Sequence, residues 1–160
     1  MNFMKKIAVF VDVQNIYYTT RDIFGRQFNY RKLWQQLSLQ GEIVSATAYA
    51  IARNDDSQIK FQDALKYIGF TVKLKPYIQR KDGSAKGDWD VGITIDVLET
   101  AKRVDTIILL SGDGDFDLLL KHVMSHHNVI TEVYGVPELT ARSLIDAASH
   151  FKPINKELLR

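Results

Sequence analysis

The sequence has no cysteine, only three prolines and no long apolar run. Without cysteine the chain forms neither disulfide bonds nor thiolate metal sites, which excludes a disulfide-stabilised secreted domain. A membrane-spanning helix needs about 20 consecutive, mostly apolar residues, and no stretch of the sequence approaches that length. These absences favour a cytoplasmic protein that does not associate with a membrane.

The N-terminal segment MNFMKKIAVFVDV has the outline of a signal peptide, with two lysines before an apolar run. The run is shorter than the usual ~7–15 residues, and Asp12 ends it with no cleavage site of small residues. It is rich in β-branched residues, which is typical of a strand buried on both faces. We therefore expect the first strand of a sheet over residues 6–11.

The length of 160 residues fits one soluble globular domain spanning residues 1–160. Its net charge of +2 is unevenly distributed, because residues 88–117 hold eight of the 19 acids and only two bases. An acidic centre in a basic surround suits a metal site that serves an anionic polymer. Acids that collect at helix N-termini would give the same composition, so both interpretations stand at this point.

Apolar patterning alternates short buried runs with helical periodicity. Strands are expected over residues 6–11, 44–51, 70–78, 106–110 and 129–134, and helices over residues 30–37, 54–67, 88–101, 115–126 and 140–148. The polar, basic segment 79–87 is expected to be a loop, and Pro76 favours an edge position for the third strand. This order predicts a three-layer α/β/α fold around a mostly parallel, five-stranded sheet.

Acidic residues follow two of the buried runs. Asp12 ends the first strand, and the fourth is followed by SGDGDF, whose glycines permit a tight turn that carries Asp113 and Asp115. A third acidic group, Asp88 or Asp90, lies where the helix before the fourth strand begins. Each acid could be a helix cap, although Asp12 fits that role least. Carboxylates gathered at one sheet edge repel one another unless a cation neutralises them, which favours a shared metal site.

The ligand types favour Mg²⁺ or Mn²⁺ over zinc, because oxygen donors dominate and cysteine is absent. His122 and His126 have helical spacing but lack the glutamate of the HExxH zinc motif. The sequence also lacks a P-loop, a GxGxxG fingerprint, a nucleophile elbow, the DxDx[TV] motif of haloacid dehalogenase-type phosphatases and the acid pattern of response-regulator receivers. Few other kinds of parallel-sheet site use acids after the first strand, after the fourth strand and at the start of the helix before the fourth strand.

Three motifs together resemble the NYN domain, and in particular its LabA-like bacterial branch within the PIN-like nuclease superfamily. They are FVDVQN at residues 10–15, KGDWDV at 86–91 and SGDGDF at 111–116. The resemblance covers a core of about residues 5–151, followed by a short C-terminal tail, and departs from the family at Ser149, where an acid is common. It implies the strand order 3-2-1-4-5 and a Mg²⁺ or Mn²⁺ site that cleaves RNA.

The resemblance also implies roles for individual residues. The metal-binding acids would be Asp12, Asp90, Asp113 and Asp115, with Asn15 completing the catalytic set by supporting the site or orienting phosphate. Asp96 would be an outer-shell residue. Asp88 and Asp117 remain solvated acids or helix caps.

Basic side chains near the acidic motifs are candidate RNA contacts. Arg80, Lys81 and Lys86 lie in the basic loop, with Lys73 and Lys75 on the neighbouring strand. A solvated loop is the alternative for the first three. The aromatic side chains of Tyr17, Tyr18 and Trp89 either stack on unpaired bases or belong to the core.

The resulting hypothesis is a metal-dependent ribonuclease that acts on single-stranded RNA. Two alternatives are a non-catalytic RNA-binding or regulatory module that keeps the fold, and a small-phosphoester hydrolase with the same metal. The sequence leaves open the RNA target, endo- or exonucleolytic cleavage, the number of metal ions, the general base and the oligomeric state.

Overall fold

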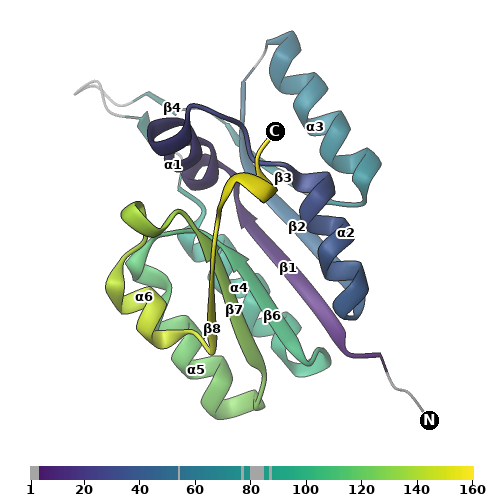
Figure 1. The fold of residues 1–160 in the computed structure, drawn as a ribbon, viewed down its shortest axis with the longest axis vertical. Coiled ribbons are helices and arrows are strands. Elements are labelled where there is room, and N and C mark those ends of the chain that lie inside the picture. The colour runs from purple at the N-terminus through teal and green to yellow at the C-terminus, as the bar shows by residue number, and fades with distance from the viewer. Residues whose placement is uncertain (1–3, 54, 77, 80–84, 87) are drawn as a thin grey trace.

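The structure is a computed structural model that describes residues 4–53, 55–76, 78–79, 85–86 and 88–160, with the main chain alone for 78–79 and 85–86. Six parallel strands form the central sheet in the order β3-β2-β1-β6-β7-β8 (Figure 1). The predicted α/β fold and the predicted order of its first five strands are confirmed. The expected number of strands is wrong by one, because a sixth strand follows the fifth at the sheet edge.

The strands lie close to the predicted positions. Their bounds are β1 (Lys6–Asp12), β2 (Glu42–Ala52), β3 (Thr71–Pro76), β6 (Thr106–Leu110), β7 (Ile130–Gly135) and β8 (His150–Pro153). As Pro76 predicts, β3 is an edge strand. The expected loop over residues 79–87 contains part of a short antiparallel pair, β4 (Ile78–Gln79) with β5 (Ala85–Lys86).

The sixth strand escapes prediction because it has four residues, HFKP, and none of them is fully buried. It pairs with the carboxyl-terminal half of β7. The residues beyond it, expected as a tail, contribute Ile154, Leu158 and Leu159 to the core. The C-terminal segment therefore closes one face of the sheet.

Helices cover both faces of the sheet. They are α1 (Val13–Phe24), α2 (Tyr30–Gln40), α3 (Asp56–Ile68), α4 (Asp90–Thr100), α5 (Asp117–His127) and α6 (Arg142–Ala147). Four 3₁₀ turns complete the described elements: η1 (Ala101–Arg103), η2 (Gly114–Phe116), η3 (Pro137–Leu139) and η4 (Lys156–Leu158). Among the described helices, none combines the length and the apolar composition needed to cross a bilayer.

Alternate residues of β1 belong to two separate cores, since successive side chains of a strand point to opposite faces. Ile7, Val9 and Val11 pack with α1, α2, α3 and the C-terminal segment. Ala8 and Phe10 pack with α4, α5 and α6. This central, doubly covered position places the end of β1 beside the end of β6.

Candidate metal centre

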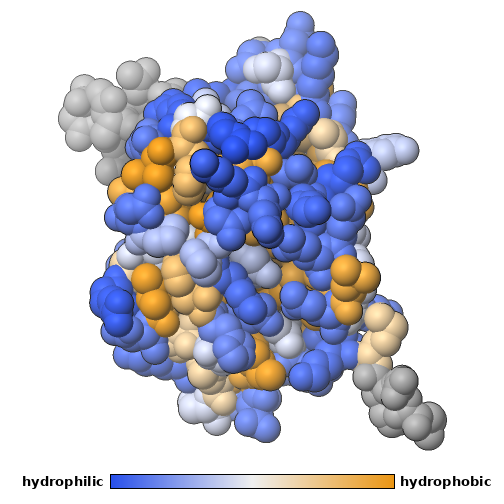
Figure 2. Space-filling view, in the orientation of Figure 1, coloured by the Kyte–Doolittle hydropathy of each residue, from blue (hydrophilic) through white to orange (hydrophobic). Residues whose placement is uncertain are grey.

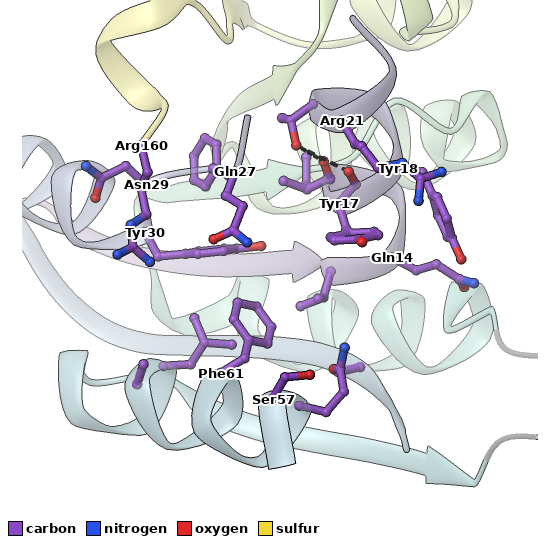
Figure 3. A pocket seen from close by; sticks show the side chains of 18 of the residues that line it. Gln14, Tyr17, Tyr18, Arg21, Gln27, Asn29, Tyr30, Ser57, Phe61 and Arg160 are labelled. Carbon is purple, nitrogen blue, oxygen red and sulfur yellow. Dashed lines mark hydrogen bonds between the residues drawn. The ribbon is translucent and has the colours of Figure 1, made fainter. Parts of the chain in front are cut away.

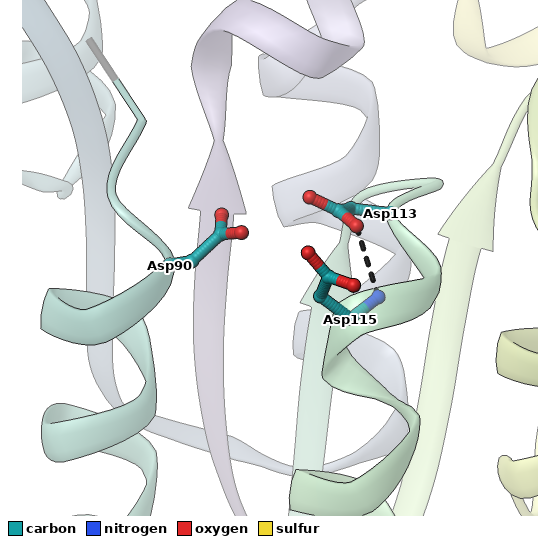
Figure 4. A group of neighbouring side chains, drawn as sticks. All are labelled: Asp90, Asp113 and Asp115. Atoms are coloured by element: carbon teal, nitrogen blue, oxygen red, sulfur yellow. Dashed lines mark hydrogen bonds between the residues drawn. The ribbon is translucent and has the colours of Figure 1, made fainter. Parts of the chain in front are cut away.

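Three carboxylates converge at the carboxyl edge of the sheet. One oxygen each from Asp90, Asp113 and Asp115 lies within 4.8 Å of the others. Asp90 is the first residue of α4, whereas Asp113 and Asp115 flank the start of η2 just beyond β6. Figure 4 shows the carboxylates pointing toward one another from these two sides. The structure thus brings together three of the four predicted metal-binding acids.

Asp12, the fourth acid, lies beside this group at the end of β1. Its carboxylate accepts a hydrogen bond from the hydroxyl of Ser111 (3.1 Å) and one from the main-chain N–H of Asn15 (3.4 Å). The second contact makes Asp12 the N-cap of α1, a helix for which the sequence analysis named no element. Asp12 therefore has the cap role that the sequence disfavoured, as well as its place next to the cluster.

Ser111 joins the end of β1 to the turn that carries two of the acids. Its fully buried hydroxyl donates to Asp12 and accepts a hydrogen bond from the main-chain N–H of Asp113 (3.1 Å). Asp113 in turn accepts one from the N–H of Asp115 (2.9 Å), as Figure 4 shows. Ser111 is part of the motif SGDGDF, but the sequence pattern predicts no role for it. Its position directly after a buried strand and before the acidic turn is the signal that could have found it.

Asn15 holds the same turn from the other side. Its side-chain oxygen accepts a hydrogen bond from the main-chain N–H of Gly112 (2.9 Å), which ties α1 to the segment after β6. Gly112 is needed because a Cβ at this position would lie 2.6 Å from the carbonyl oxygen of Leu139. Asn15 thus supports the geometry of the acidic turn, one of the two roles that the resemblance implied.

Burial and nearby negative charge raise the pKa of two of these carboxylates, Asp90 and Asp12. Burial, the charge and hydrogen bond of Asp113 and the charges of Asp88 and Asp12 raise the pKa of Asp90 to about 7. Burial is also the main cause of the raised pKa of Asp12, opposed by its hydrogen bonds and reinforced by Asp113 and Asp88. A divalent cation would offset this repulsion, so the charge pattern suits an ion-binding site.

Asp90→Asn is expected to stabilise the metal-free protein at alkaline pH. Folded Asp90 keeps its proton up to about pH 7, far above the ordinary value of 3.8. The free energy of unfolding therefore falls as pH rises from 3.8 to about 7, because only the folded state places the new charge in a partly buried position beside other acids. Solvent screens this partly exposed carboxylate, so we expect a gain of about 1 kcal/mol at about pH 8.

Melting temperatures in a chelator test this expectation. The variant should melt about 2–4 °C above the wild type at about pH 8, and the difference should shrink toward zero near pH 4. Added Mn²⁺ should raise the melting temperature of the wild type more than that of the variant. Equal melting temperatures at alkaline pH would show that Asp90 is not under electrostatic strain.

Asp96, the outer-shell candidate, is directed toward the strands. Its carboxylate accepts hydrogen bonds from the hydroxyl of Tyr49 and the ammonium of Lys73, each at 2.7 Å. The Lys73 contact is an ion pair between half-exposed side chains. These contacts fix α4 against β2 and β3, which is a structural role for both Asp96 and Lys73.

The N-terminus of α4 is anchored by Trp89. Its indole N–H donates to the carbonyl oxygen of Ala50 (2.9 Å), and Lys75 lies over its ring at 4.7 Å while donating to the carbonyl of Asp88 (3.0 Å). Trp89 is therefore a packing residue that holds Asp90 in place. Neither Asp88 nor Asp90 is the N-cap, a position that Trp89 occupies.

Three of the remaining RNA-contact candidates, Arg80, Lys81 and Lys86, fall in the basic segment. Arg80 and Lys81 lie outside the described residues, and of Lys86 the structure describes only the main chain, paired in β5. Tyr17 is about half exposed, at 48%, and Tyr18 is partly buried. Both tyrosines lie on α1, which packs on the face of the sheet opposite to α4.

A parallel sheet covered on both faces, with an acidic cluster beyond its central strands, is the PIN-like nuclease type of fold. The chain belongs to the NYN domain family, whose model matches residues 6–155. It is also LabA-like: it is 29% identical over 158 residues to the low amplitude and bright protein LabA of Synechococcus elongatus, covering 94% of this chain and 84% of LabA.

Solved structures share the fold of this chain. A crystal structure of a protein of unknown function from Vibrio parahaemolyticus superposes with a TM-score of 0.94 at 51% identity, over 100% of this chain and 99% of that one. Ribokinase from Giardia lamblia matches with a TM-score of 0.51 at 11% identity, over 96% of this chain and 59% of its own. That second likeness concerns the fold alone.

Proposed function

We propose that this protein is a metal-dependent ribonuclease that hydrolyses phosphodiester bonds of single-stranded RNA. The observation that carries the proposal is the convergence of Asp90, Asp113 and Asp115 from two separate elements to within 4.8 Å. NYN domains are generally associated with RNA, and their PIN-like relatives commonly use divalent ions. The acidic site supports the same chemistry in this chain.

The donor set fits Mg²⁺ or Mn²⁺. Asp90, Asp113 and Asp115 offer hard carboxylate oxygens, and their spacing suits an ion that keeps part of its water shell and contacts only some of them directly. Asp12 lies next to these acids and is the fourth ligand candidate. When bound, the ion would supply a Lewis acid for the scissile phosphate and a means of activating water.

The surrounding residues hold the acids in place for this role. Ser111 and Asn15 fix the turn after β6 through its main-chain N–H groups, so the carboxylates keep their positions when phosphate approaches. Precise positioning is central to phosphoryl chemistry, because a displacement of about 1 Å can cost roughly 100-fold in rate. Asp12, Asp90, Asp113, Asp115 and Asn15 form the proposed catalytic set.

Removal of the metal tests the proposal. Purified protein should degrade a labelled single-stranded RNA with Mn²⁺ or Mg²⁺, and a chelator should abolish the activity reversibly. Salt-dependent RNA binding with no cleavage under either metal would contradict the proposal and establish the non-catalytic binding module. Hydrolysis of free nucleotides with no preference for polymers would establish the small-phosphoester enzyme.

A further inference from the structure

A second, cationic cavity lies at the same edge of the sheet as the acidic cluster. It encloses about 1000 Å³ between α1, the segment before α2, and α3. Figure 3 shows Gln14 and Tyr17 of α1 across this hollow from Ser57 and Phe61 of α3. We call it the α1–α3 cleft. Its size is at the upper end of what small-ligand pockets offer, about 300–1,000 Å³.

The charge of the cleft is of one sign. Six of its lining side chains are cationic, namely Arg21, Arg26, Arg31, Arg53, Lys60 and Arg160, and no aspartate or glutamate occurs among its described lining residues. Figure 2 shows strongly hydrophilic side chains over the upper part of this face of the molecule, where α1, α3 and the C-terminus meet. A concave surface of this composition concentrates anions.

One of these cations, Arg21, lies close to two aromatic rings. The guanidinium of Arg21 lies 4.9 Å from the ring centre of Tyr18 and 5.4 Å from that of Tyr17. The half-exposed ring of Tyr17 also lines the cleft. An exposed aromatic face next to a guanidinium matches the pairing of base and phosphate in a nucleotide.

The cleft begins next to Asp12, the acid that lies beside the acidic cluster. Val13 and Gln14 line the cleft and directly follow Asp12. Tyr30, on the cleft floor, has a pKa raised by burial and also by the charge of Asp12, so the two sites lie within electrostatic range. A strand of nucleic acid leaving the acidic cluster past the start of α1 would enter the cleft.

We propose that the α1–α3 cleft binds nucleotides of the RNA strand that flank the phosphate held at the acidic cluster, an inference that rests on the proposed function. Phosphates would contact Arg21, Arg31 and Lys60, while an unpaired base would stack on Tyr17. Arg26 has a different task, because its guanidinium donates to the carbonyl oxygens of Arg160 (2.8 Å) and Leu159 (3.4 Å). It shapes the rim of the cleft.

A charge-matched pair of variants tests the site by binding alone. R21Q/K60Q removes one cation from each wall of the cleft, whereas K102Q/R103Q removes the same charges from the exposed turn η1 at the opposite edge of the sheet. Affinity for an RNA of about 12 nucleotides is measured in a chelator, so that no cleavage occurs. R21Q/K60Q should weaken binding about tenfold or more and lower the salt slope by about 1.4, while K102Q/R103Q should change little. Equal affinities of the two variants would overturn the proposal.

Tyr17 supplies a second, independent test. Tyr17→Ala should weaken RNA binding about fivefold or more through lost stacking, and Tyr17→Phe should retain it. Leu39→Ala, an exposed apolar side chain near the end of α2 and outside the cleft, is the control. Binding insensitive to Tyr17→Ala would contradict the stacking role.

The affinity for a mononucleotide, compared with that for an RNA oligonucleotide, shows whether the cleft binds an RNA strand or a free nucleotide. The proposal requires the oligonucleotide to bind more tightly than a nucleoside monophosphate, because only the strand can contact several cations of the cleft at once. Equal affinities would overturn it in favour of a free-nucleotide pocket. The binding measurements use no metal, so their result does not depend on hydrolysis. If R21Q/K60Q and Tyr17→Ala leave binding unchanged, the hydrolysis assay can still succeed. If no hydrolysis occurs, the binding measurements still test the cleft.

Discussion

Asp113→Asn is expected to lower the rate of RNA hydrolysis by about 100- to 1,000-fold. The substitution keeps the shape of the side chain and an oxygen that can accept the hydrogen bond from the N–H of Asp115. It removes one negative charge from the centre of the cluster, where Asp113 lies within reach of both Asp90 and Asp115. The loss should therefore come from weaker binding of the metal and of the transition state, with no fall in the melting temperature.

Asp117→Asn is the matched control for this experiment. Asp117 lies in the first turn of α5, two residues beyond the cluster, and its carboxylate accepts a hydrogen bond from the N–H of Leu118 (2.6 Å). Both variants change the net charge equally. Single-turnover cleavage of a labelled RNA under saturating Mn²⁺ should show the loss for Asp113→Asn alone. Similar rates for the two variants would mean that the cluster does not catalyse hydrolysis.

Gly112→Ala is expected to destabilise the fold by about 2–3 kcal/mol and to abolish hydrolysis. The added Cβ would lie 2.6 Å from the main-chain oxygen of Leu139, an atom that cannot rotate away. The turn must therefore shift, and with it Asp113 and the N–H that Asn15 binds. The melting temperature should fall by about 5–10 °C.

Gly114→Ala provides the graded comparison. Its Cβ would meet only side-chain atoms, the Cβ of Ala141 at 2.9 Å and the hydroxyl of Ser143 at 3.0 Å. The serine can change rotamer, so we expect a cost of about 1 kcal/mol. Thermal melts rank the two variants, and a Gly114 variant as unstable as the Gly112 variant would show that the backbone contact is not decisive.

Burial determines how much of the fold the sequence predicts. The strand β6 is the run TIILL and all five residues are buried, so its apolar pattern is unambiguous. The strand β8 has one aromatic residue, Phe151, among polar neighbours, and it forms through main-chain pairing with β7. Such an edge strand depends on a tertiary partner, which local periodicity does not reveal.

The candidate site was likewise predictable from the sequence only in part. Carboxylates after buried strands predict a shared sheet edge, and Asp113 and Asp115 lie there next to Asp90. The spacing of the residues leaves Asp88 and Asp90 as equals, and the resemblance to the NYN domain selects Asp90, which is the first residue of α4. The sequence pattern predicts no role for Ser111, because a serine hydroxyl gains its meaning only from its partners in three dimensions.

The hydrogen bond between Ser111 and Asp12 joins residues 99 positions apart in the chain. Closing so long a loop is costly in entropy, and it occurs only when β6 pairs with β1. A nascent chain still missing its second half consequently has Asp12 but no acidic centre. Cation binding at this site would therefore be coupled to folding, and any hydrolytic activity would be confined to molecules that have completed the central sheet.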